Sequence, residues 1–200
     1  MRWLIGVMLL GLLGLLGLLG CASLPEPQPV ALLDEQTGVT IRRVAAAIVL
    51  ARDRRDVAAH ARDYLTLVAV ERNQAGRRQL ALLVYRWSTI DRRMAVATDA
   101  GLRDLLLVAD GRDVLLRPIA GSLPPELRPR AELLQPRVTD VEAVAYEVDP
   151  GTLRMLAEGS DLVASFRGAT RANSFHLWQD GRPALLRFIA PWVSIETSTD

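Results

Sequence analysis

Beyond its N-terminal segment the chain consists of short apolar stretches separated by turn residues, a pattern typical of an all-β protein. Residues 80–87 are apolar at nearly every position, as expected of a central strand that is buried on both faces. The predicted strands are Thr40–Leu50, Leu65–Glu71, Leu80–Trp87, Leu102–Ala109, Val114–Arg117, Val141–Val148, Leu162–Arg167, Phe175–Gln179 and Ala184–Ile189. The pattern therefore predicts an all-β or β-rich fold, an antiparallel β-sandwich with one or two short helices.

Turn residues predict how several of these strands are connected. Asn73 to Gly76 separates the second strand from the third. Asp110-Gly111 and Asp180-Gly181 each stand between two apolar runs, and Asp-Gly in that position is a strong signal for a type I′ hairpin. We therefore expect a tight antiparallel hairpin at each Asp-Gly pair.

One segment has the signals of a short helix. Asp149 can accept hydrogen bonds as the N-cap, Pro150 suits the first helical position, and Gly159 suits the C-terminal end. Leu153 and Leu156 then share one face. A helix this short is not stable alone, so we expect it to pack on the sheet.

Two twelve-residue segments, 110–121 and 180–191, are identical at eight positions. Two interpretations stay open. One is an internal duplication, with similar halves at residues 37–121 and 137–191 joined by a proline-rich connection. The other is a chance similarity between two hairpins, because leucines after a turn are common.

The N-terminus has the features of a secretory signal peptide. A short basic region at Arg2 precedes an apolar run from Leu4 to Leu19, and a small residue, Gly20, follows. The alternative is a retained transmembrane helix. The apolar core is shorter than the roughly 20 residues that a spanning helix needs, and no basic cluster follows it. We therefore expect residues 1–20 to be removed.

The residues Leu18-Leu19-Gly20-Cys21 resemble the lipobox of bacterial lipoproteins. The resemblance implies cleavage between Gly20 and Cys21, a diacylglycerol on the Cys21 sulfur and an N-acyl chain on its amino group. Ala22 is not the Asp that holds such proteins at the inner membrane, which implies the periplasmic face of the outer membrane. Residues 21–36 are then expected to form a lipidated, proline-rich tether, and residues 37–200 a single β-sandwich domain.

The body is similar, over Ala61–Leu67 and Tyr85–Arg92, to uncharacterised proteobacterial lipoproteins with a β-rich body. This resemblance concerns localisation and fold class only. It implies no particular activity.

Composition narrows the classes of function. All 24 basic residues are Arg, and without residues 1–20 the 23 that remain balance 23 acidic residues, so no basic patch for nucleic acid is indicated. Cys21 is the only cysteine, which leaves no thiol for a disulfide, a metal or a nucleophile once it is acylated. Recognisable zinc, serine-hydrolase and phosphate-loop motifs are absent from the sequence.

The two histidines are the remaining candidates for chemistry. If residues 55–64 were helical, Asp56, His60 and Asp63 would share a face, as in a metal or acid–base site. The alternative, which we favour, is a solvated face whose carboxylates pair with nearby arginines. His176 follows Phe175 in a predicted strand and should share the side of Trp178, as a structural residue.

A polar segment after the third predicted strand is the remaining candidate site. Arg86, Trp87, Asp91, Arg92 and Arg93 could hold an anionic group or contact a partner through forked hydrogen bonds. The alternative is a strand end with solvated charges. Six aromatic residues are expected to pack in the core or against the sheet, namely Trp87, Phe166, Phe175, Trp178, Phe188 and Trp192.

These features favour a non-catalytic, lipid-anchored envelope protein that binds another protein or helps to assemble an envelope complex. No metal and no cofactor are expected apart from the covalent lipid, and no nucleic acid. The alternative is a carrier or sensor of a lipid or other apolar ligand. A hydrolase of envelope polymers with paired carboxylates is less favoured.

Overall fold

A computed structural model describes residues 27–90, 104–120, 123–167 and 173–196 of the chain. In these ranges the protein is β-rich, with antiparallel strands and the helices α2 (Pro150–Glu158) and α3 (Arg182–Glu196), which confirms the predicted fold class. The strands are β1 (Val30–Asp34), β2 (Val39–Arg43), β3 (Ile48–Asp53), β4 (Arg62–Gln74), β5 (Arg77–Ser88), β6 (Leu105–Ala109), β7 (Arg112–Leu116), β8 (Glu142–Glu147), β9 (Leu162–Phe166) and β10 (Phe175–Gln179).

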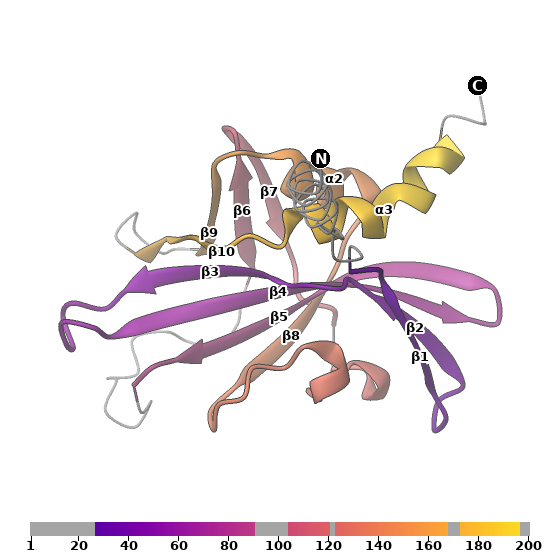
Figure 1. The fold of residues 1–200 in the computed structure, drawn as a ribbon, viewed down its shortest axis with the longest axis horizontal. Helices are drawn as coiled ribbons and strands as arrows, with labels where there is room; N and C mark the ends of the chain where they lie inside the picture. Colours follow the sequence, from indigo (N-terminus) through magenta and orange to yellow (C-terminus); the bar gives the residue numbers. More distant parts are fainter. Residues whose placement is uncertain (1–26, 91–103, 121–122, 168–172, 197–200) are drawn as a thin grey trace, which may run out of the picture.

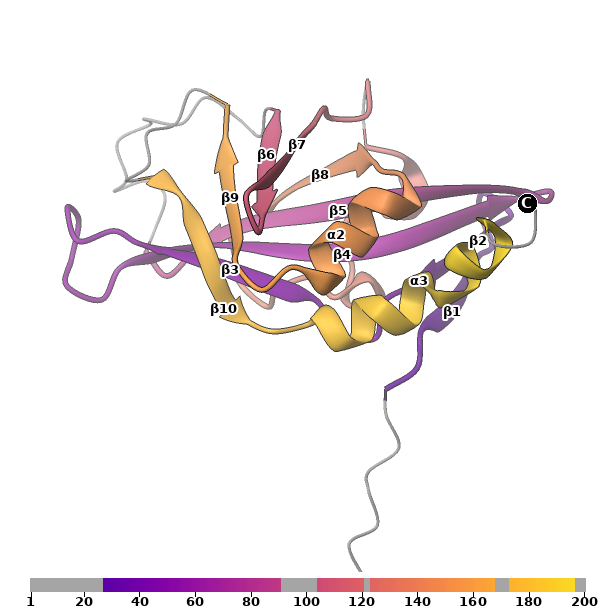
Figure 2. The ribbon, with the colours of Figure 1, turned by 90° about the horizontal axis from the view of Figure 1, so that it is seen from above.

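All ten of these strands belong to one continuous sheet. Its order is β1-β2-β4-β3-β10-β9-β6-β7, and β5 pairs with both β4 and β8. The sheet curls so strongly that the chain after β7 reaches β8, where the Ile119 N–H donates to the Ala145 carbonyl at 2.9 Å. Strands β6, β7 and β9 therefore stand above the layer of β3, β4, β5 and β8, with α2 and α3 beside them (Figures 1 and 2).

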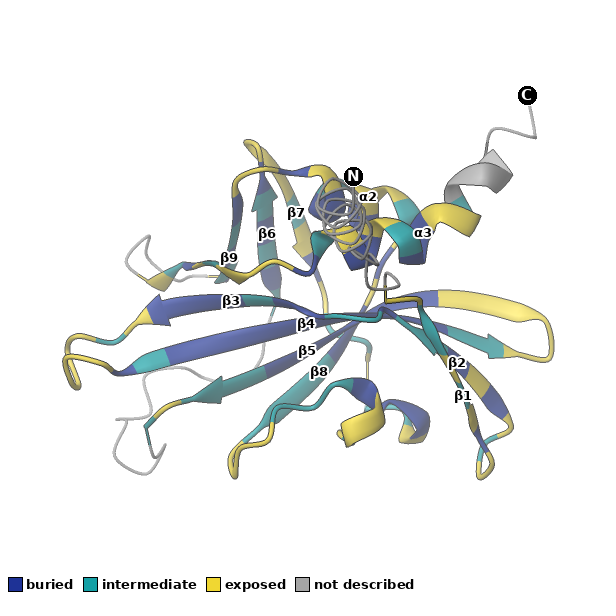
Figure 3. Ribbon diagram, in the orientation of Figure 1, coloured by how far each residue is buried: buried dark blue, intermediate teal, exposed yellow. Residues whose placement is uncertain are grey.

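The long hairpin of β4 and β5 is the centre of the sheet. Its strands pair over twelve residues, from Asp63 with Ser88 to Gln74 with Arg77. Helices α2 and α3 cover one face, and the segment containing η2 (Pro125–Leu127) and η3 (Ala131–Leu133) covers part of the other (Figure 1). Burial on both faces explains why residues 80–85 are apolar at every position, and it confirms the predicted central strand (Figure 3).

The core between the sheet and the helices is filled by aliphatic side chains. Leu156 of α2 and Leu185 of α3 pack over Leu67 and Leu82 of the central hairpin. The cavity that these side chains enclose has a volume of only about 10 Å³. That is about the space of one water molecule and far less than an acyl chain requires.

Two predicted turns are present, and the one at Asp110-Gly111 has the predicted type I′ conformation. Ala75 and Gly76 join β4 to β5 with φ of 51° and 86°, and Asp110 and Gly111 join β6 to β7 with φ of 50° and 77°. Both pairs of positive φ values are those of a type I′ turn. The Asp110 carboxylate also accepts hydrogen bonds from the Ser160 N–H and hydroxyl, at 3.0 and 2.7 Å. This hairpin is therefore fixed to the loop that follows α2.

Helix α2 confirms the prediction made from its capping residues. The Asp149 carboxylate accepts hydrogen bonds from the Thr152 N–H at 2.8 Å and from the Thr152 hydroxyl at 2.6 Å. Pro150 is at the first helical position, and Gly159 follows the last. Leu153 and Leu156 are fully buried, so the helix is held by packing as well as by its caps.

The second predicted hairpin is wrong. β10 ends at Gln179, and the chain after Asp180-Gly181 forms α3 where a strand at Ala184–Ile189 was predicted. Pro183 cannot donate to a strand ladder but suits the start of a helix. Gly181 lies against β3, so close that a Cβ would be 2.3 Å from the Ala47 carbonyl oxygen. Asp110-Gly111 is followed by the strand β7, whereas Asp180-Gly181 is followed by the helix α3. The two similar sequences therefore do not form a repeated structure.

The N-terminal boundary of the body also differs from the prediction. The tether was expected to reach residue 36, but β1 begins at Val30 and pairs with β2 over five residues. The Asp34 carboxylate holds the turn after β1 by accepting from the Gln36 and Thr37 N–H groups, and Arg130 pairs with it at 3.1 Å. Pairing with β2, which follows after a short turn, and contact with Arg130, which is distant in sequence, order this stretch.

The predicted strand Thr40–Leu50 is interrupted. Its two parts, β2 and β3, lie one after the other along the same edge of β4. Between them the Val44 N–H donates to the Ala69 carbonyl at 3.0 Å, and residues 45–46 leave the ladder. The break is located where Gly181 and the start of α3 approach the sheet.

Candidate functional site

The structure describes only part of the predicted candidate site. Gly20 and Cys21 of the lipobox, and Asp91, Arg92 and Arg93 of the polar segment, lie outside the described residues. Arg86 and Trp87 are both in β5, next to each other in the sequence. Successive residues of a strand point to opposite faces of the sheet, so these two side chains do not form one site.

Arg86 belongs to the helix-facing side of the sheet. Its Nε lies 2.9 Å from a carboxylate oxygen of Glu142, which is its register partner in β8. Its guanidinium also stands over the ring of Phe166, 6.0 Å from the centroid. The predicted grouping of Arg86 with Trp87 is therefore wrong, and Arg86 is part of an ion pair across two strands.

Trp87 lies on the other side, in a cluster that we call the aromatic shelf: Arg62, Tyr64, Trp87 and Trp178. The rings of Tyr64 and Trp87 are stacked, with centroids 4.1 Å apart and planes 11° apart. Trp178 meets Tyr64 edge-on at 6.2 Å, and the Arg62 guanidinium lies 4.4 Å from the Trp178 centroid. The Trp87 Nε1–H donates to the Thr66 hydroxyl at 3.0 Å.

The register of the sheet explains how the aromatic shelf forms. Tyr64 in β4 and Trp87 in β5 are direct cross-strand partners, and such aromatic pairs stabilise a sheet. Trp178 comes from β10, where the pairing with β3 shifts between Leu177 and Gln179. A bulge of this kind re-aims a side chain.

Trp178 packs against the sheet, as one of the two expected environments, but most of it is exposed. Its side chain is 56% exposed, whereas Phe166, Phe175 and Phe188 are buried as predicted. His176 is exposed in the same strand, and its structural role stays a prediction. The aromatic shelf thus combines a buried Tyr64 with a largely exposed Trp178.

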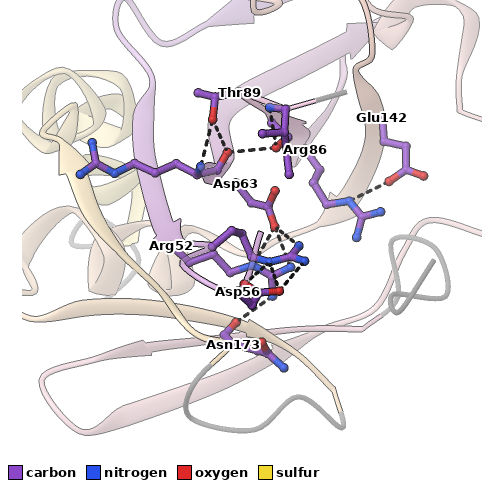
Figure 4. A network of polar contacts seen from close by, with 11 residues as sticks. Arg52, Asp56, Asp63, Arg86, Thr89, Glu142 and Asn173 are labelled. Carbon is purple, nitrogen blue, oxygen red and sulfur yellow. Dashed lines mark hydrogen bonds and ion pairs between the residues drawn. The ribbon is translucent and has the colours of Figure 1, made fainter. Parts of the chain in front are cut away.

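A network of charged side chains supports the strand ends that carry the aromatic shelf (Figure 4). The Asp63 carboxylate accepts hydrogen bonds from the Arg52 guanidinium at 2.8 and 3.0 Å and from Arg54 at 3.1 Å. Arg54 also pairs with Asp56 at 3.0 Å, and Arg62 with Asp53 at 2.8 Å. Charged side chains of β3, β4 and the connection between them therefore form one set of ion pairs.

The pKa of Asp63 shows which effect dominates in this network. Burial alone would raise this pKa, but hydrogen bonds from Arg52, Ser88 and Arg54 lower it below its ordinary value. Asp63 is therefore ionised at neutral pH and acts as an acceptor. A general acid would need the opposite shift.

The structure also tests the hypothesis that residues 55–64 form a helix with Asp56, His60 and Asp63 on one face. These residues are not helical: a turn spans 55–60, and Asp63 is in β4. Asp63 pairs with Arg52, as in the interpretation that we favoured, but both side chains are buried and not solvated. Asp56 pairs with Arg54, and the face shared with His60 does not exist. Within the described residues no group of three metal-ligating side chains is found.

A second buried cluster fixes α3 to the sheet. The Glu71 carboxylate accepts hydrogen bonds from Arg42 at 2.8 and 3.0 Å, from Arg78 at 2.6 and 3.1 Å and from the Trp192 indole at 3.1 Å. Burial would raise the pKa of Glu71, but these donors lower it to about 2. Arg42 also donates to the Phe188 carbonyl at 2.9 Å. This cluster is structural, because its carboxylate is enclosed by donors of the same chain.

Part of the aromatic shelf could be predicted from the sequence. Trp87 was singled out, but Tyr64, Arg62 and Trp178 were not connected with it. The alternation in β4 and β5 could have paired Tyr64 with Trp87 once the turn at Ala75-Gly76 was recognised. Nothing in the local sequence shows that β10 lies beside β3.

Comparisons with known proteins found no relative of this chain: no family model, no curated protein and no solved structure matches it. Of the helices in the described ranges, none is long and apolar enough to cross a membrane.

Proposed function

We propose that this protein is a lipid-anchored envelope lipoprotein without catalytic activity, whose β-rich body binds a partner protein through the aromatic shelf. The observation that carries the proposal is the exposure of Trp178, 56%, in contact with Tyr64 and Arg62. Trp, Tyr and Arg are the residues that most often dominate the energy of protein–protein binding.

The rigidity of the aromatic shelf supports this role. Tyr64 is held by stacking on Trp87, and Trp87 by its hydrogen bond to Thr66. The Asp63 network fixes the strand ends behind them. A preformed surface loses little conformational entropy on binding, which favours affinity.

The alternatives receive less support from the described residues. A carrier of an apolar ligand needs an enclosed interior space. The cavity beneath α2 and α3 is about 10 Å³, and the larger hollows beside Pro118 and Pro136, of about 560 and 440 Å³, are open to solvent. For a hydrolase with paired carboxylates Asp63 is a poor candidate, because Arg52 and Arg54 already bind its carboxylate. The lipid anchor itself rests on the resemblance of Leu18 to Cys21 to the lipobox.

A crosslinking experiment in cells tests the proposed binding surface. A photo-crosslinking amino acid is placed at Trp178, and a matched control carries it at Leu115, which is 41% exposed on β7. We expect a discrete crosslinked partner from position 178 that is absent at 115, and that weakens when Tyr64→Ala is added. Equal, diffuse crosslinking from both positions would contradict the proposal.

The anchor needs its own test. Cys21→Ser should abolish incorporation of labelled fatty acid and release the protein from membranes. Labelling that persists in this variant would disprove the anchor without bearing on the aromatic shelf.

A further inference from the structure

The exposed positions on the outer face of α3 are apolar, and the charged residue on that face, Arg187, is half-buried. Its inner face is buried and consists of Ala184, Leu185, Phe188 and Ile189. The exposed positions of the helix up to Trp192 are Pro183, Leu186, Ala190 and Pro191, and Leu186 is 41% exposed. A helix on the surface of a soluble domain normally presents charged or polar residues there.

Strand β1 adds apolar side chains on the same side of the molecule. Ala31 and Leu33 are exposed, Leu33 by 65%. Ala31 is the register partner of Arg42, whose guanidinium lies over the Phe188 ring of α3 at 4.4 Å. Because Ala31 and Leu33 alternate on one face of β1, both point to the side on which α3 lies.

We propose that these six residues, Ala31, Leu33, Pro183, Leu186, Ala190 and Pro191, form a membrane-facing surface that rests on the bilayer holding the lipid anchor. The inference depends on the proposed lipidation of Cys21. Nine residue steps separate Cys21 from Val30, a span of at most about 30 Å for a fully extended chain. The start of β1, and the membrane-facing surface beside it, therefore stay close to the lipid.

The size of this surface favours the bilayer over a second protein. Six residues are roughly a quarter of the 20 to 30 that each partner contributes to a standard protein interface. A weak apolar contact suffices for a body that is already tethered, because the tether gives a high effective concentration of membrane. The side chains of Pro183, Ala190 and Pro191 also offer no hydrogen bonds to a specific partner.

This orientation leaves the aromatic shelf free. Tyr64 and Trp87 lie on the face of the sheet opposite to the one that Leu67 and Leu82 present to α2 and α3. Contact of α3 with lipid therefore does not cover the aromatic shelf, and a partner can bind there while the body lies on the membrane.

Fluorescence quenching in vesicles tests the proposed surface on the full lipoprotein. Because Cys21 is the only cysteine and would be acylated, an introduced cysteine is a unique site for an environment-sensitive dye. Leu186→Cys and Ala190→Cys probe the surface. Leu115→Cys is the matched control, because Leu115 and Leu186 are both 41% exposed and α2 lies between β7 and α3 (Figure 2).

The labelled proteins are reconstituted into phosphatidylethanolamine–phosphatidylglycerol vesicles with or without nitroxide-labelled acyl chains. We expect the nitroxide to quench the dye at 186 and 190 at least threefold more than at 115. Equal quenching at all three positions would overturn the inference. Protection of the dye at 186 from the nitroxide that rises with the protein-to-lipid ratio would also overturn it, because it indicates contact with a second copy of the protein. Circular dichroism checks that each variant is folded.

Flotation of the unlabelled protein separates this inference from the anchor. If the wild-type protein floats with vesicles and position 186 is not quenched, the membrane-facing surface is refuted and the anchor stands. If the wild-type protein does not float, the anchor itself is refuted.

Discussion

Replacing Glu71 by Gln removes the charge that holds α3 against the sheet while keeping the shape of the side chain. Glu71 is 5% exposed, and its carboxylate accepts hydrogen bonds from Arg42, Arg78 and Trp192. In the variant two arginines face a neutral amide, and one of its ends carries N–H donors instead of an acceptor. We expect the loss to appear in the free energy of unfolding at neutral pH.

The pKa of Glu71 gives the size of the effect. It falls from an ordinary value of 4.5 to about 2, and each pKa unit corresponds to about 1.4 kcal/mol. The ionised Glu71 therefore stabilises the fold by about 3 kcal/mol at pH 7. Because the folded pKa is lowered, this stabilisation is complete above about pH 4.5 and is lost as the pH falls toward 2, with about 2 kcal/mol gone by pH 3.

Urea unfolding of the wild type and of Glu71→Gln at pH 7, 5 and 3, followed by circular dichroism, measures this difference. The two curves should be about 3 kcal/mol apart at pH 7 and about 1 kcal/mol apart at pH 3. Other carboxylates with lowered pKa values contribute equally to both proteins and cancel. The matched control is Glu158→Gln: Glu158 pairs with Arg154 on the exposed face of α2 at 2.8 Å and should change stability by less than about 0.5 kcal/mol. A constant separation at all three pH values would refute the reasoning.

Three further predictions concern backbone, cap and surface. Gly181→Ala should destabilise the fold by more than 2 kcal/mol in thermal or urea unfolding, because its Cβ would lie 2.3 Å from the Ala47 carbonyl oxygen; a change below about 0.5 kcal/mol would contradict the close approach. Asp149→Ala should lower stability by about 1 kcal/mol through loss of the N-cap of α2, whereas Asp149→Ser should restore most of it, and equal losses in both would exclude the cap as the cause. Trp178→Ala should change stability by less than about 1 kcal/mol, since the side chain is 56% exposed, but should abolish co-purification of the crosslinked partner, and undiminished recovery would count against the aromatic shelf.

Elements whose signals are local followed from the sequence. The caps of α2, the turns at Ala75-Gly76 and Asp110-Gly111, and the two-sided burial of β5 depend on residues within one or two turns of chain. The filled core beneath α2 and α3 could not be read in the same way. Apolar strands line both solid and hollow interiors, and only the packing of Leu156 and Leu185 distinguishes them.

The two similar segments at 110–121 and 180–191 show where local reasoning stops. Both begin with Asp-Gly-Arg and share Leu-Leu-Arg, yet one forms β7 and the other α3. Two signals indicated the helix: Pro183, and the spacing of Leu185, Phe188, Ile189 and Trp192, which suits a helical face. The prediction followed the similarity to the hairpin at 110–121 instead of these signals. In the structure, burial of this face against the sheet stabilises α3.

By itself the sequence determined the β-rich class, the tight turns, the capped helix and the expectation of a lipid anchor, because each depends on neighbouring residues or on composition. Only the tertiary structure decided that Arg86 and Trp87 belong to different faces, that Trp178 joins Tyr64 from a strand more than a hundred residues away, and that the exposed positions of α3 up to Trp192 are apolar. The physical reason is that these residues become neighbours only when the strands pair and the helix packs on the sheet. A local sequence pattern does not specify which strands pair.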